Sequence, residues 1–347
     1  MISTVGDLEN FIASQGLSWD QCKLPSREVF SKTFAMRIPL LYAELIDWED
    51  IDDPLRLMVL PDEKELNIAD YELADPIGDE RFEKVRGLVH RYPDRCLLFF
   101  TTSCKVHCRF CFRRDVIGMP RPADIEGCLK YLREHPEISE VIFTGGDPAV
   151  FSEEFLEQIL PRIGEISHIK FVRFHTRALV MNPKMINERW LSKMSLLGRK
   201  KIVFALHINH VRELSPELKE LVLALKNQGI EILAQTVLLK GVNDNTAVLA
   251  DLFRGLGDVG IKPYYLHHPD FARGTKHFRI SIEKGQEIFS GLRGKLSGHL
   301  IPEYVVDLPG GDGKYPIMWL KSLGKNTYEA VNFQGEKVFY VDPAEDF

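Results

Sequence analysis

The alternation of two kinds of segment constrains the fold of this chain more than any other feature. From about Cys96 onward, short runs of β-branched and aromatic residues alternate with longer amphipathic runs. Strands of a buried parallel sheet, each followed by a helix, have this pattern. The predicted strands span 96–101, 140–144, 169–174, 201–206, 230–236 and 261–266, and the predicted helices span 122–135, 152–166, 184–198, 214–228, 245–258 and 283–295.

A further apolar run at 304–307 gives six or seven strand–helix units. Parallel strands that are wound right-handedly with their helices outside close into a full or partial barrel. We therefore predict an α/β fold with a partial barrel of the (βα)6 type at 91–310. Residues 1–90 are expected to form a helical segment that wraps the barrel, and 311–347 a lysine-containing loop followed by a small hairpin.

Polar and reactive side chains follow nearly every predicted strand. Because the carboxyl ends of parallel strands open at the same mouth of such a fold, these side chains should gather there. In chain order they are Cys104, Cys108 and Cys111; Gly145, Gly146 and Asp147; His175 and Arg177; His207 and His210; Gln235; His267, His268 and Asp270; and Asp307 with Lys314. The sequence therefore predicts one site built from several loops. We interpret the histidines as supporting residues and assign none of them a catalytic role.

Charge and composition exclude several classes of function. The 347 residues include 50 acidic and 44 basic side chains, a net charge of −6, which argues against a dedicated nucleic-acid-binding protein. The first fifteen residues do not resemble a secretory signal, and no stretch is apolar for long enough to span a membrane. The six cysteines are too few and too clustered for a disulfide scaffold. We therefore expect a cytoplasmic location.

Three cysteines lie in the loop after the first predicted strand, within TTSCKVHCRFCFRR. Cys104, Cys108 and Cys111 are spaced at i, i+4 and i+7. Soft thiolate ligands select zinc or iron–sulfur clusters, and three of them can hold three irons of a [4Fe–4S] cluster. The fourth iron is then left for a small molecule. The alternatives are a zinc knuckle in which His107 supplies the fourth ligand, or three unrelated core cysteines.

A glycine-rich loop near the C-terminus contains a single lysine. In VVDLPGGDGKYP, residues 305–316, three glycines precede Lys314. Such a loop allows the backbone to approach a ligand closely and lets the lysine point at it. The phosphate-loop spacing GxxxxGK[ST] fails, because Leu308 stands at the first glycine and Tyr315 follows the lysine. The alternative interpretation is a surface turn with a solvated lysine.

The segment CKVHCRFC resembles the CxxxCxxC signature of radical S-adenosylmethionine (SAM) enzymes. In that superfamily the open iron of a [4Fe–4S] cluster binds the methionyl amino and carboxylate groups of SAM. An electron from the cluster then cleaves SAM to give a 5′-deoxyadenosyl radical. Gly145, Gly146 and Asp147 are similar to the superfamily's glycine-rich motif that receives the amino group of SAM.

Further motifs narrow the resemblance to the lysine 2,3-aminomutases, including the shorter relatives that make β-lysine for the modification of elongation factor P. The similar segments are FAMRIPLLYAELI, DDPLRLMVLP, HRYPDR, CKVHCRFCFRR, FTGGDP, QTVLLKGVND, KPYYLHHPD, GLRGKLSG and VVDLPGGDGK. Enzymes of this family combine the radical cofactor with pyridoxal 5′-phosphate (PLP). They convert L-α-lysine into β-lysine by moving its amino group from C2 to C3. The resemblance therefore implies an isomerase with these cofactors.

The resemblance also implies which residues bind PLP. Lys314 matches the lysine that forms an imine with PLP. Arg95 and Gln235 match contacts of the PLP phosphate, and Arg91 is a further candidate for the same role. Guanidinium groups bind phosphate through two hydrogen bonds, which agrees with this implication. The alternative for both arginines is a surface position on an N-terminal connector.

Three further residues match contacts of the amino-acid substrate. Arg113 matches the arginine that binds the α-carboxylate, and Asp270 and Asp307 match the two carboxylates that hold the ε-ammonium group. Two acidic groups at one mouth suit a cationic side chain. A relative that acts on glutamate is expected to lack this pair, so the pair favours L-lysine. Alternatively, Asp307 caps the turn that follows it.

The sequence departs from the longer clostridial-type enzymes at a zinc site. Those enzymes build it from cysteines in a C-terminal extension and one barrel cysteine, whereas Asn245 stands at the barrel position here and no cysteine follows Cys128. We therefore expect no structural zinc. The resemblance further implies an electron donor such as flavodoxin or ferredoxin and a functional link to an elongation factor P lysyl ligase, with no nucleic-acid or membrane partner. A homo-oligomer is compatible with the resemblance.

Two alternative functions are compatible with the same motifs. One is an aminomutase for arginine, ornithine or glutamate. The other is a non-enzymatic module with zinc or a cluster that binds translation factors or RNA. The lack of a basic, aromatic-rich stripe in the sequence argues against the second alternative.

Overall fold

A ten-stranded sheet forms the centre of the computed structural model, which describes residues 1–343. Each strand lies beside the strand that precedes it in sequence, and β3 to β9 are parallel. β1, β2 and β10 are antiparallel additions at the edges. The strands are β1 Glu83–Val85, β2 Leu88–Tyr92, β3 Arg95–Thr101, β4 Glu140–Gly145, β5 Phe171–Thr176, β6 Lys201–His207, β7 Glu231–Val237, β8 Lys262–His267, β9 Glu303–Leu308 and β10 Gly313–Pro316.

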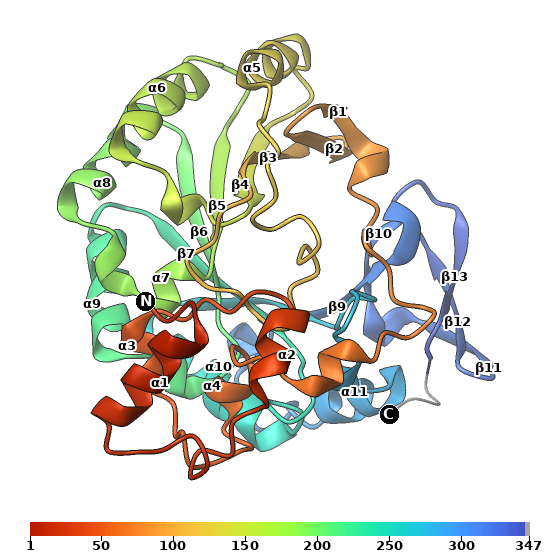
Figure 1. Ribbon diagram of the computed structural model, residues 1–347. Helices are drawn as coiled ribbons and strands as arrows, with labels where there is room; N and C mark the ends of the chain where they lie inside the picture. The colour runs from red at the N-terminus through yellow and green to blue at the C-terminus, as the bar shows by residue number, and fades with distance from the viewer. Residues whose placement is uncertain (344–347) are drawn as a thin grey trace.

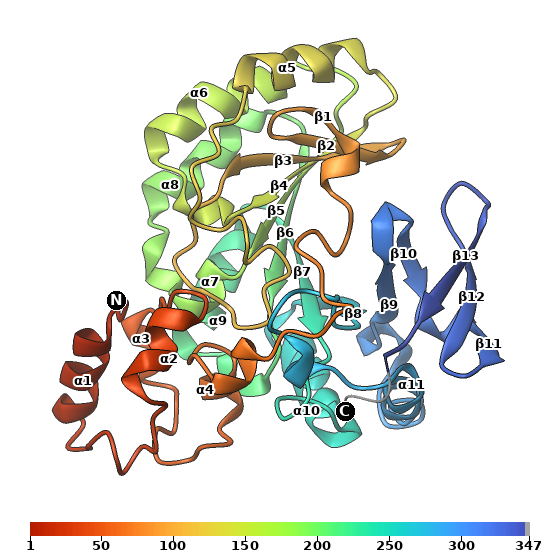
Figure 2. The same cartoon turned by 45° about the vertical axis from the view of Figure 1, so that its right-hand side comes forward.

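The sheet curls into an arc whose two edges, β1 and β10, are separate in the strand order (Figures 1 and 2). The predicted α/β fold with a parallel sheet is thus confirmed. The six predicted strands correspond to β3 to β8, and the apolar run at 304–307 lies in β9, so seven strands are parallel. The arc leaves a concave inner face.

Helices cover the convex side of the arc (Figure 1). Polar side chains define where they begin, since Ser152, Ser215 and Asn245 each accept a hydrogen bond from a backbone N–H three residues on. The helix predicted at 184–198 is α8 followed by a 3₁₀ helix at Lys193–Leu197. The helices are α5 Ile125–Glu134, α6 Glu153–Gly164, α7 Ala178–Met181, α8 Glu188–Ser192, α9 Pro216–Asn227, α10 Thr246–Val259 and α11 Ile282–Ser290.

The main core lies between the sheet and these helices. Three phenylalanines from adjacent strands stack there, with ring centroids 5.0 Å apart for Phe143 and Phe174 and 5.1 Å apart for Phe174 and Phe204. Because strand side chains alternate between the two faces, the neighbouring residues Val203 and Ala205 point the other way and form a small cluster of their own. The inner face therefore keeps room for a cavity.

The N-terminal segment packs over the mouth at the carboxyl ends of the strands. It contains α1 Val5–Ser14, α2 Arg27–Lys32, α3 Leu40–Ala43 and α4 Pro54–Leu57, and its apolar residues share a second core with Val106, Met181 and Leu239. The prediction of a helical segment at 1–90 missed β1 and the start of β2. These strands are short and join at Gly87, whose φ of +99° permits the tight turn.

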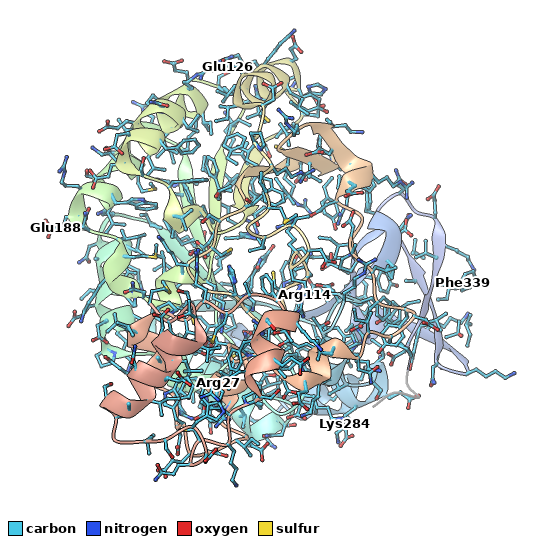
Figure 3. The ribbon with its side chains drawn as sticks, viewed as in Figure 1. Arg27, Arg114, Glu126, Glu188, Lys284 and Phe339 are labelled. Carbon is cyan, nitrogen blue, oxygen red and sulfur yellow. The ribbon has the colours of Figure 1, made fainter. Side chains whose placement is uncertain are left out.

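The C-terminal residues form a separate three-stranded sheet of β11 Lys321–Gly324, β12 Thr327–Val331 and β13 Lys337–Val341. The predicted hairpin is β12 with β13, and β11 is an additional strand. Asp342 accepts a hydrogen bond from the Ile282 N–H at 2.7 Å, which connects this sheet to α11. Figure 3 shows Phe339 on its outer side. Residues 344–347, the end of the predicted segment 311–347, lie outside the described residues.

Candidate active site

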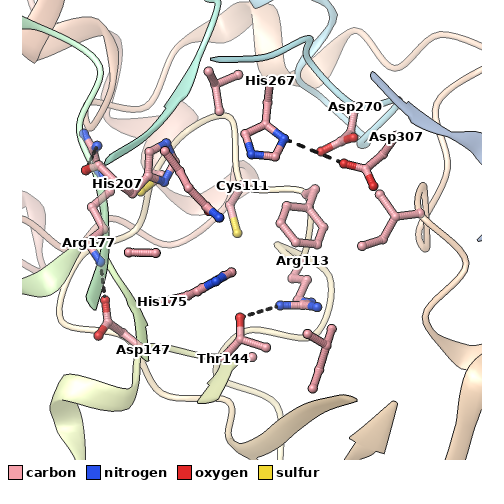
Figure 4. Close-up of a pocket in the computed structure, with 18 of the residues that line it drawn as sticks. Cys111, Arg113, Thr144, Asp147, His175, Arg177, His207, His267, Asp270 and Asp307 are labelled. Carbon is pink, nitrogen blue, oxygen red and sulfur yellow. Dashed lines mark hydrogen bonds and ion pairs between the residues drawn. The ribbon is translucent and has the colours of Figure 1, made fainter. Parts of the chain in front are cut away.

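One cavity collects all of the residues to which the sequence analysis assigns a binding or catalytic role, whereas His210 and His268, also expected at the mouth, do not line it. It has a volume of about 290 Å³ and extends from the loops at the mouth along the concave face of the sheet. Figure 4 shows part of its wall. The predicted residues that line it are Cys104, Cys108, Cys111, Gly145, Gly146, Asp147, Arg91, Arg95, Gln235, Arg113, Asp270, Asp307 and Lys314.

The first half of the cysteine loop, which we define as residues 102–124 between β3 and α5, is held by the N-terminal segment. Arg37 Nη1 donates a hydrogen bond to the carbonyl oxygen of Cys104 at 2.7 Å. The backbone N–H of His107 donates to the carbonyl oxygen of Arg37 at 3.0 Å. The loop is therefore positioned by protein contacts on its outer side, while its cysteines line the cavity.

The second half of the loop is held by a buried ion-pair cluster that the sequence analysis missed. Arg109 donates from Nε and Nη2 to the two carboxylate oxygens of Glu65, at 2.8 and 2.6 Å. Arg114 Nη2 donates to the same carboxylate at 2.5 Å. The side chains of Glu65 and Arg109 are 0% and 1% exposed. Figure 3 shows Arg114 beside the N-terminal helices that cover the mouth.

The surroundings of the three thiols fit an iron–sulfur cluster. Burial raises the pKa of Cys104, Cys108 and Cys111, that of Cys108 to about 12. Such thiols stay protonated at neutral pH unless a cation stabilises the thiolate, and iron ions supply that charge. Within residues 1–343, no three His, Cys, Asp or Glu side chains are gathered closely enough to bind a single metal ion.

The turn Gly145-Gly146-Asp147 brings the end of β4 against the cysteine loop. A Cβ atom on Gly146 would lie 2.3 Å from the carbonyl oxygen of Ser103, so this approach requires glycine. The Asp147 carboxylate accepts four hydrogen bonds, two of them from the turn after β5, and thus connects the ends of β4 and β5 (Figure 4). The donors are Thr176 Oγ1 at 2.7 Å, the N–H groups of Arg177 and Ala178 at 2.8 Å, and that of Ala149 at 3.0 Å.

Because a carboxylate has about four acceptor positions, the contacts within the protein occupy the side chain of Asp147. Its predicted contact with SAM stays a prediction. The Gly146 N–H donates to the carbonyl oxygen of Thr101 at 2.6 Å, so the carbonyl groups of the two glycines, which line the cavity beside the cysteine loop, are the better candidates for that role.

Lys314 and Asp307 form an ion pair where β9 and β10 are paired. Lys314 Nζ donates to the two carboxylate oxygens at 2.8 and 2.7 Å. Burial by itself lowers the pKa of Lys314, but the charge of Asp307 outweighs burial and raises it. Burial likewise acts to raise the pKa of Asp307, yet the charge of Lys314 and a hydrogen bond from His267 hold it below its usual range.

Asp270 lies next to this pair with no hydrogen-bond partner among the described residues (Figure 4). Burial, followed by the negative charge of Asp307, raises the pKa of Asp270 to about 7. A cation that enters the cavity would remove this penalty, because it would stabilise the ionised carboxylate. The two predicted acidic residues are thus together, and one of them is free to accept a cation.

Arg113 and Arg91 are both bound by Asp79, which the sequence analysis did not identify. Arg113 donates from Nε and Nη2 to Asp79 Oδ2 at 3.0 and 2.6 Å, and from Nη1 to Thr144 Oγ1 at 3.0 Å. Arg91 Nη2 donates to Asp79 Oδ1 at 3.1 Å and to the carbonyl oxygen of Ile77 at 2.7 Å. The guanidinium of Arg91 is thus engaged by residues 77–79, and its contact with a phosphate stays a prediction.

Tyr92 connects two of the residues predicted to bind PLP. Its hydroxyl accepts a hydrogen bond from the Lys314 N–H at 2.8 Å, and the Arg95 guanidinium lies 4.0 Å from the centroid of its ring. Arg95 also donates to Asp94 at 2.7 Å. Gln235, on β7, lines the same cavity. Tyr92 belongs to the HRYPDR segment, but nothing in that pattern indicated its contact with Lys314.

Three histidines at the ends of β5, β6 and β8 also face the cavity (Figure 4). Burial lowers the pKa of His175, His207 and His267, so each imidazole is neutral at pH 7. Their Nε2 atoms are buried and have no hydrogen-bond partner among the described residues. The sequence analysis treated them as supporting residues, whereas their position makes them available to a ligand.

The fold and the cysteine loop define a class of protein once they are compared with known families. Residues 98–253 match the model of the radical SAM superfamily, which identifies a radical SAM domain in this part of the chain. The whole chain is also 34% identical to the L-lysine 2,3-aminomutase of Methanococcus maripaludis, over 99% of this chain and 80% of that protein. The chain belongs to the lysine 2,3-aminomutase family.

Two further relatives describe the range of this family. The chain is 36% identical to the L-lysine 2,3-aminomutase of Clostridium subterminale, over 90% of this chain and 76% of that protein. It is also 36% identical to the glutamate 2,3-aminomutase of Clostridioides difficile, over 90% of this chain and 75% of that protein. Membership of the family makes the chain an aminomutase, an isomerase that uses a [4Fe–4S] cluster and SAM. The predicted enzyme class is confirmed.

Proposed function

We propose that this protein is a PLP-dependent lysine 2,3-aminomutase that converts L-α-lysine into β-lysine. The observation that carries the proposal is the charge distribution of the cavity, which has Arg113 at one part of its wall and Asp270 and Asp307 at another (Figure 4). L-Lysine has a carboxylate at one end and an ammonium group at the other. Opposite charges at the two ends of a site orient such a substrate in one direction.

Arg113 is the residue that we assign to the substrate carboxylate. Its side chain is mostly buried, and planar guanidinium groups bind carboxylates through two parallel hydrogen bonds. Asp270 and Asp307 are assigned to the ε-ammonium group. The Lys314 ammonium lies against Asp307, at 2.7 Å, and stands in for a substrate ammonium group. This contact supports the proposal, because it displays an ammonium group bound at that position.

Lys314, Arg95 and Gln235 are the residues that we assign to PLP. Lys314 supplies the amine that an aldehyde cofactor needs, and Arg95 supplies a cation for a phosphate group. Tyr92 holds the backbone of Lys314 and packs against Arg95, which keeps the two residues near each other. When bound, PLP stabilises the radical through which the substrate amino group migrates between adjacent carbons.

Cys104, Cys108 and Cys111 are assigned to the [4Fe–4S] cluster, and the Gly145-Gly146 backbone to the amino group of SAM. The N-terminal segment covers the mouth and keeps water from the cluster side of the cavity. When bound, the cluster and SAM supply the radical that abstracts a substrate hydrogen, after an electron arrives from a donor such as flavodoxin or ferredoxin. The isomerisation returns that hydrogen to the product, so the reaction consumes no oxidant.

The main alternative is an aminomutase for another amino acid. Glutamate would place a second carboxylate against Asp270 and Asp307, which like-charge repulsion disfavours. Arginine and ornithine are also cationic, and they differ from lysine in the length of the side chain. A non-enzymatic binding module does not agree with membership of an aminomutase family.

The test is an anaerobic assay of the reconstituted protein with PLP, SAM, dithionite and one amino acid at a time. We expect β-lysine from L-lysine and no β-amino acid from L-glutamate, measured by mass spectrometry after chromatographic separation of enantiomers. Cleavage of SAM without any change of lysine would refute the assignment of Asp270 and Asp307. A greater yield from arginine or ornithine would favour the alternative substrate.

A second experiment tests PLP separately from catalysis. The Lys314→Ala protein should lose the visible absorbance of bound PLP while it keeps the absorbance of the iron–sulfur cluster. Retention of the PLP band in this variant would refute the assignment of Lys314. A matched control is Lys325→Ala, which removes an exposed lysine from the turn between β11 and β12.

The use of the product is a further part of the proposal. The intact VVDLPGGDGK segment is similar to the enzymes of free-lysine metabolism and favours the release of free β-lysine, whereas Asn245 at the position of the zinc cysteine is similar to the branch associated with elongation factor P. Supply of β-lysine to an elongation factor P lysyl ligase is the alternative, and the enantiomer found in the assay distinguishes the two.

None of the helices within residues 1–343 is both long and apolar enough to cross a membrane. We propose a cytoplasmic enzyme.

A further inference from the structure

The segment at residues 75–82, which we call the latch segment, lies between the carboxylate-binding arginine and the loop of Lys314. Its Asp79 binds Arg113, and its Arg81 donates to the carbonyl oxygen of Gly310 at 3.2 Å. A Cβ atom on Gly78 would lie 2.6 Å from the Gly311 nitrogen, so the two backbones are in direct contact. The latch segment therefore touches both parts of the site.

Two N–H donors of Arg113 have no partner among the described residues. A guanidinium has five N–H donors, and among the described residues two donate to Asp79 Oδ2 and one to Thr144 Oγ1. One N–H on each terminal nitrogen is left. A carboxylate that binds an arginine in the bidentate manner needs two such donors. Asp79 can therefore hold Arg113 without taking the donors that a ligand needs.

The side chains of Arg91, Arg113 and Asp79 together carry one positive charge that is not balanced within the group. Arg91 and Arg113 carry two positive charges, and Asp79, which accepts hydrogen bonds from both, carries one negative charge. The side chains of Arg113 and Asp79 are only 10% and 14% exposed. The group thus has a net charge of +1 at a mostly buried place. One ligand carboxylate neutralises it, whereas without Asp79 two mutually repelling guanidinium groups would remain.

Asp79 is itself held in place from several sides. The backbone N–H groups of Asp79 and Glu80 donate to the carboxylate of Asp75, at 3.0 and 2.9 Å. Arg91 donates to the carbonyl oxygen of Ile77, two residues before Asp79. The segment is therefore ordered by contacts that do not involve Arg113. Asp79 is therefore held in one position, from which it can fix the orientation of the Arg113 side chain.

We infer that Asp79 is a positioning residue that orients Arg113 for the carboxylate of an α-amino-acid substrate. This inference rests on the proposed function, because it takes Arg113 as the carboxylate-binding residue. The opposite possibility is that Asp79 occupies the place of the substrate carboxylate and competes with it. The two roles predict changes of opposite sign when the charge of Asp79 is removed.

The experiment measures equilibrium binding of two ligands to the reconstituted, PLP-loaded enzyme without SAM, so that no turnover occurs. The ligands are L-lysine and cadaverine, which is lysine without its carboxylate. For Asp79→Asn we expect L-lysine to bind at least about tenfold more weakly, while the affinity for cadaverine stays at the wild-type value. Asp79→Glu, which retains the charge, should recover part of the loss. Glu80→Gln removes an exposed charge from the same segment and should change neither affinity.

Three results would overturn the inference. Tighter binding of L-lysine to Asp79→Asn would mean competition. Equal weakening of both ligands would mean a merely structural role. An unchanged affinity for L-lysine in Asp79→Asn, combined with a loss in Arg113→Lys, would refute the positioning role alone. If Arg113→Lys also keeps the wild-type affinity for L-lysine, the assignment of Arg113 in the proposed function fails as well.

Discussion

Replacing Glu65 by Gln should destabilise the protein and loosen its iron–sulfur cluster. Glu65 is fully buried and accepts hydrogen bonds from Arg109 and Arg114, which flank Cys111 in sequence. Glutamine keeps the shape of the side chain but removes the negative charge and one acceptor oxygen. Two positive charges then remain with no carboxylate partner in this cluster.

The magnitude follows from the burial of this cluster. Removing one partner of a buried ion pair costs about 3–5 kcal/mol, because the other charge is left uncompensated. The side chains of Glu65 and Arg109 are fully buried, with 0% and 1% exposed, whereas 8% of the Arg114 side chain is exposed to solvent. We therefore expect about 3–4 kcal/mol for Glu65→Gln, which corresponds to a factor of several hundred in the unfolding equilibrium.

The free energy of unfolding is measured by urea denaturation of the cluster-free protein, and the iron content is measured after anaerobic reconstitution and exposure to a chelator. We expect Glu65→Gln to lose iron faster than the wild type. The matched control is Glu63→Gln, an exposed glutamate in the same 3₁₀ helix, which should change stability by less than about 0.5 kcal/mol. A loss below about 1 kcal/mol in Glu65→Gln would refute the reasoning.

Two further predictions concern the two ends of the cavity. Asp270 with a pKa of about 7 is mostly protonated at pH 6 and mostly ionised at pH 8, so L-lysine should bind about tenfold more tightly at pH 8. Asp270→Asn should bind weakly at both pH values, and an equally steep pH dependence in that variant would exclude Asp270 as the titrating group. Gly146→Ala would place a Cβ atom 2.3 Å from Ser103 O, so it should lower the iron content, whereas Gly298→Ala, which meets no atom within 4 Å, should not. Wild-type iron content in Gly146→Ala would show that the cysteine loop can shift without cost.

The parallel sheet could be predicted because its signal is local and repeated. Each strand from β3 to β8 is a short apolar run, and most helices begin at a polar cap such as Ser152 or Asn245. The mouth of the site followed from the same regularity, since the carboxyl ends of parallel strands lie together. The cysteines, Asp270, Asp307 and Lys314 indeed line one cavity.

The remaining site residues could not be predicted because their contacts join distant parts of the chain. Glu65 is 44 residues from Arg109, and Asp79 is 34 residues from Arg113. As single acidic residues in a charged N-terminal segment, they have no spacing or periodicity that distinguishes them from solvated residues. The hydrogen bonds of Asp147 within the protein could not be predicted for the same reason, since its partners at the end of β5 are about 30 residues away.

The direct contact of Gly78 with Gly310 and Gly311 sets the order in which the site can be completed during synthesis. Arg81 and Gly310 are 229 residues apart in sequence. At the rate of roughly 5–20 residues per second at which ribosomes extend a chain, this separation takes roughly 10–45 s. The cysteine loop meets its partners Arg37 and Glu65 early, whereas the latch segment waits for the last part of the chain. The cysteine loop, including Arg113, can therefore be assembled before β9 and β10 add Asp307 and Lys314 to the site.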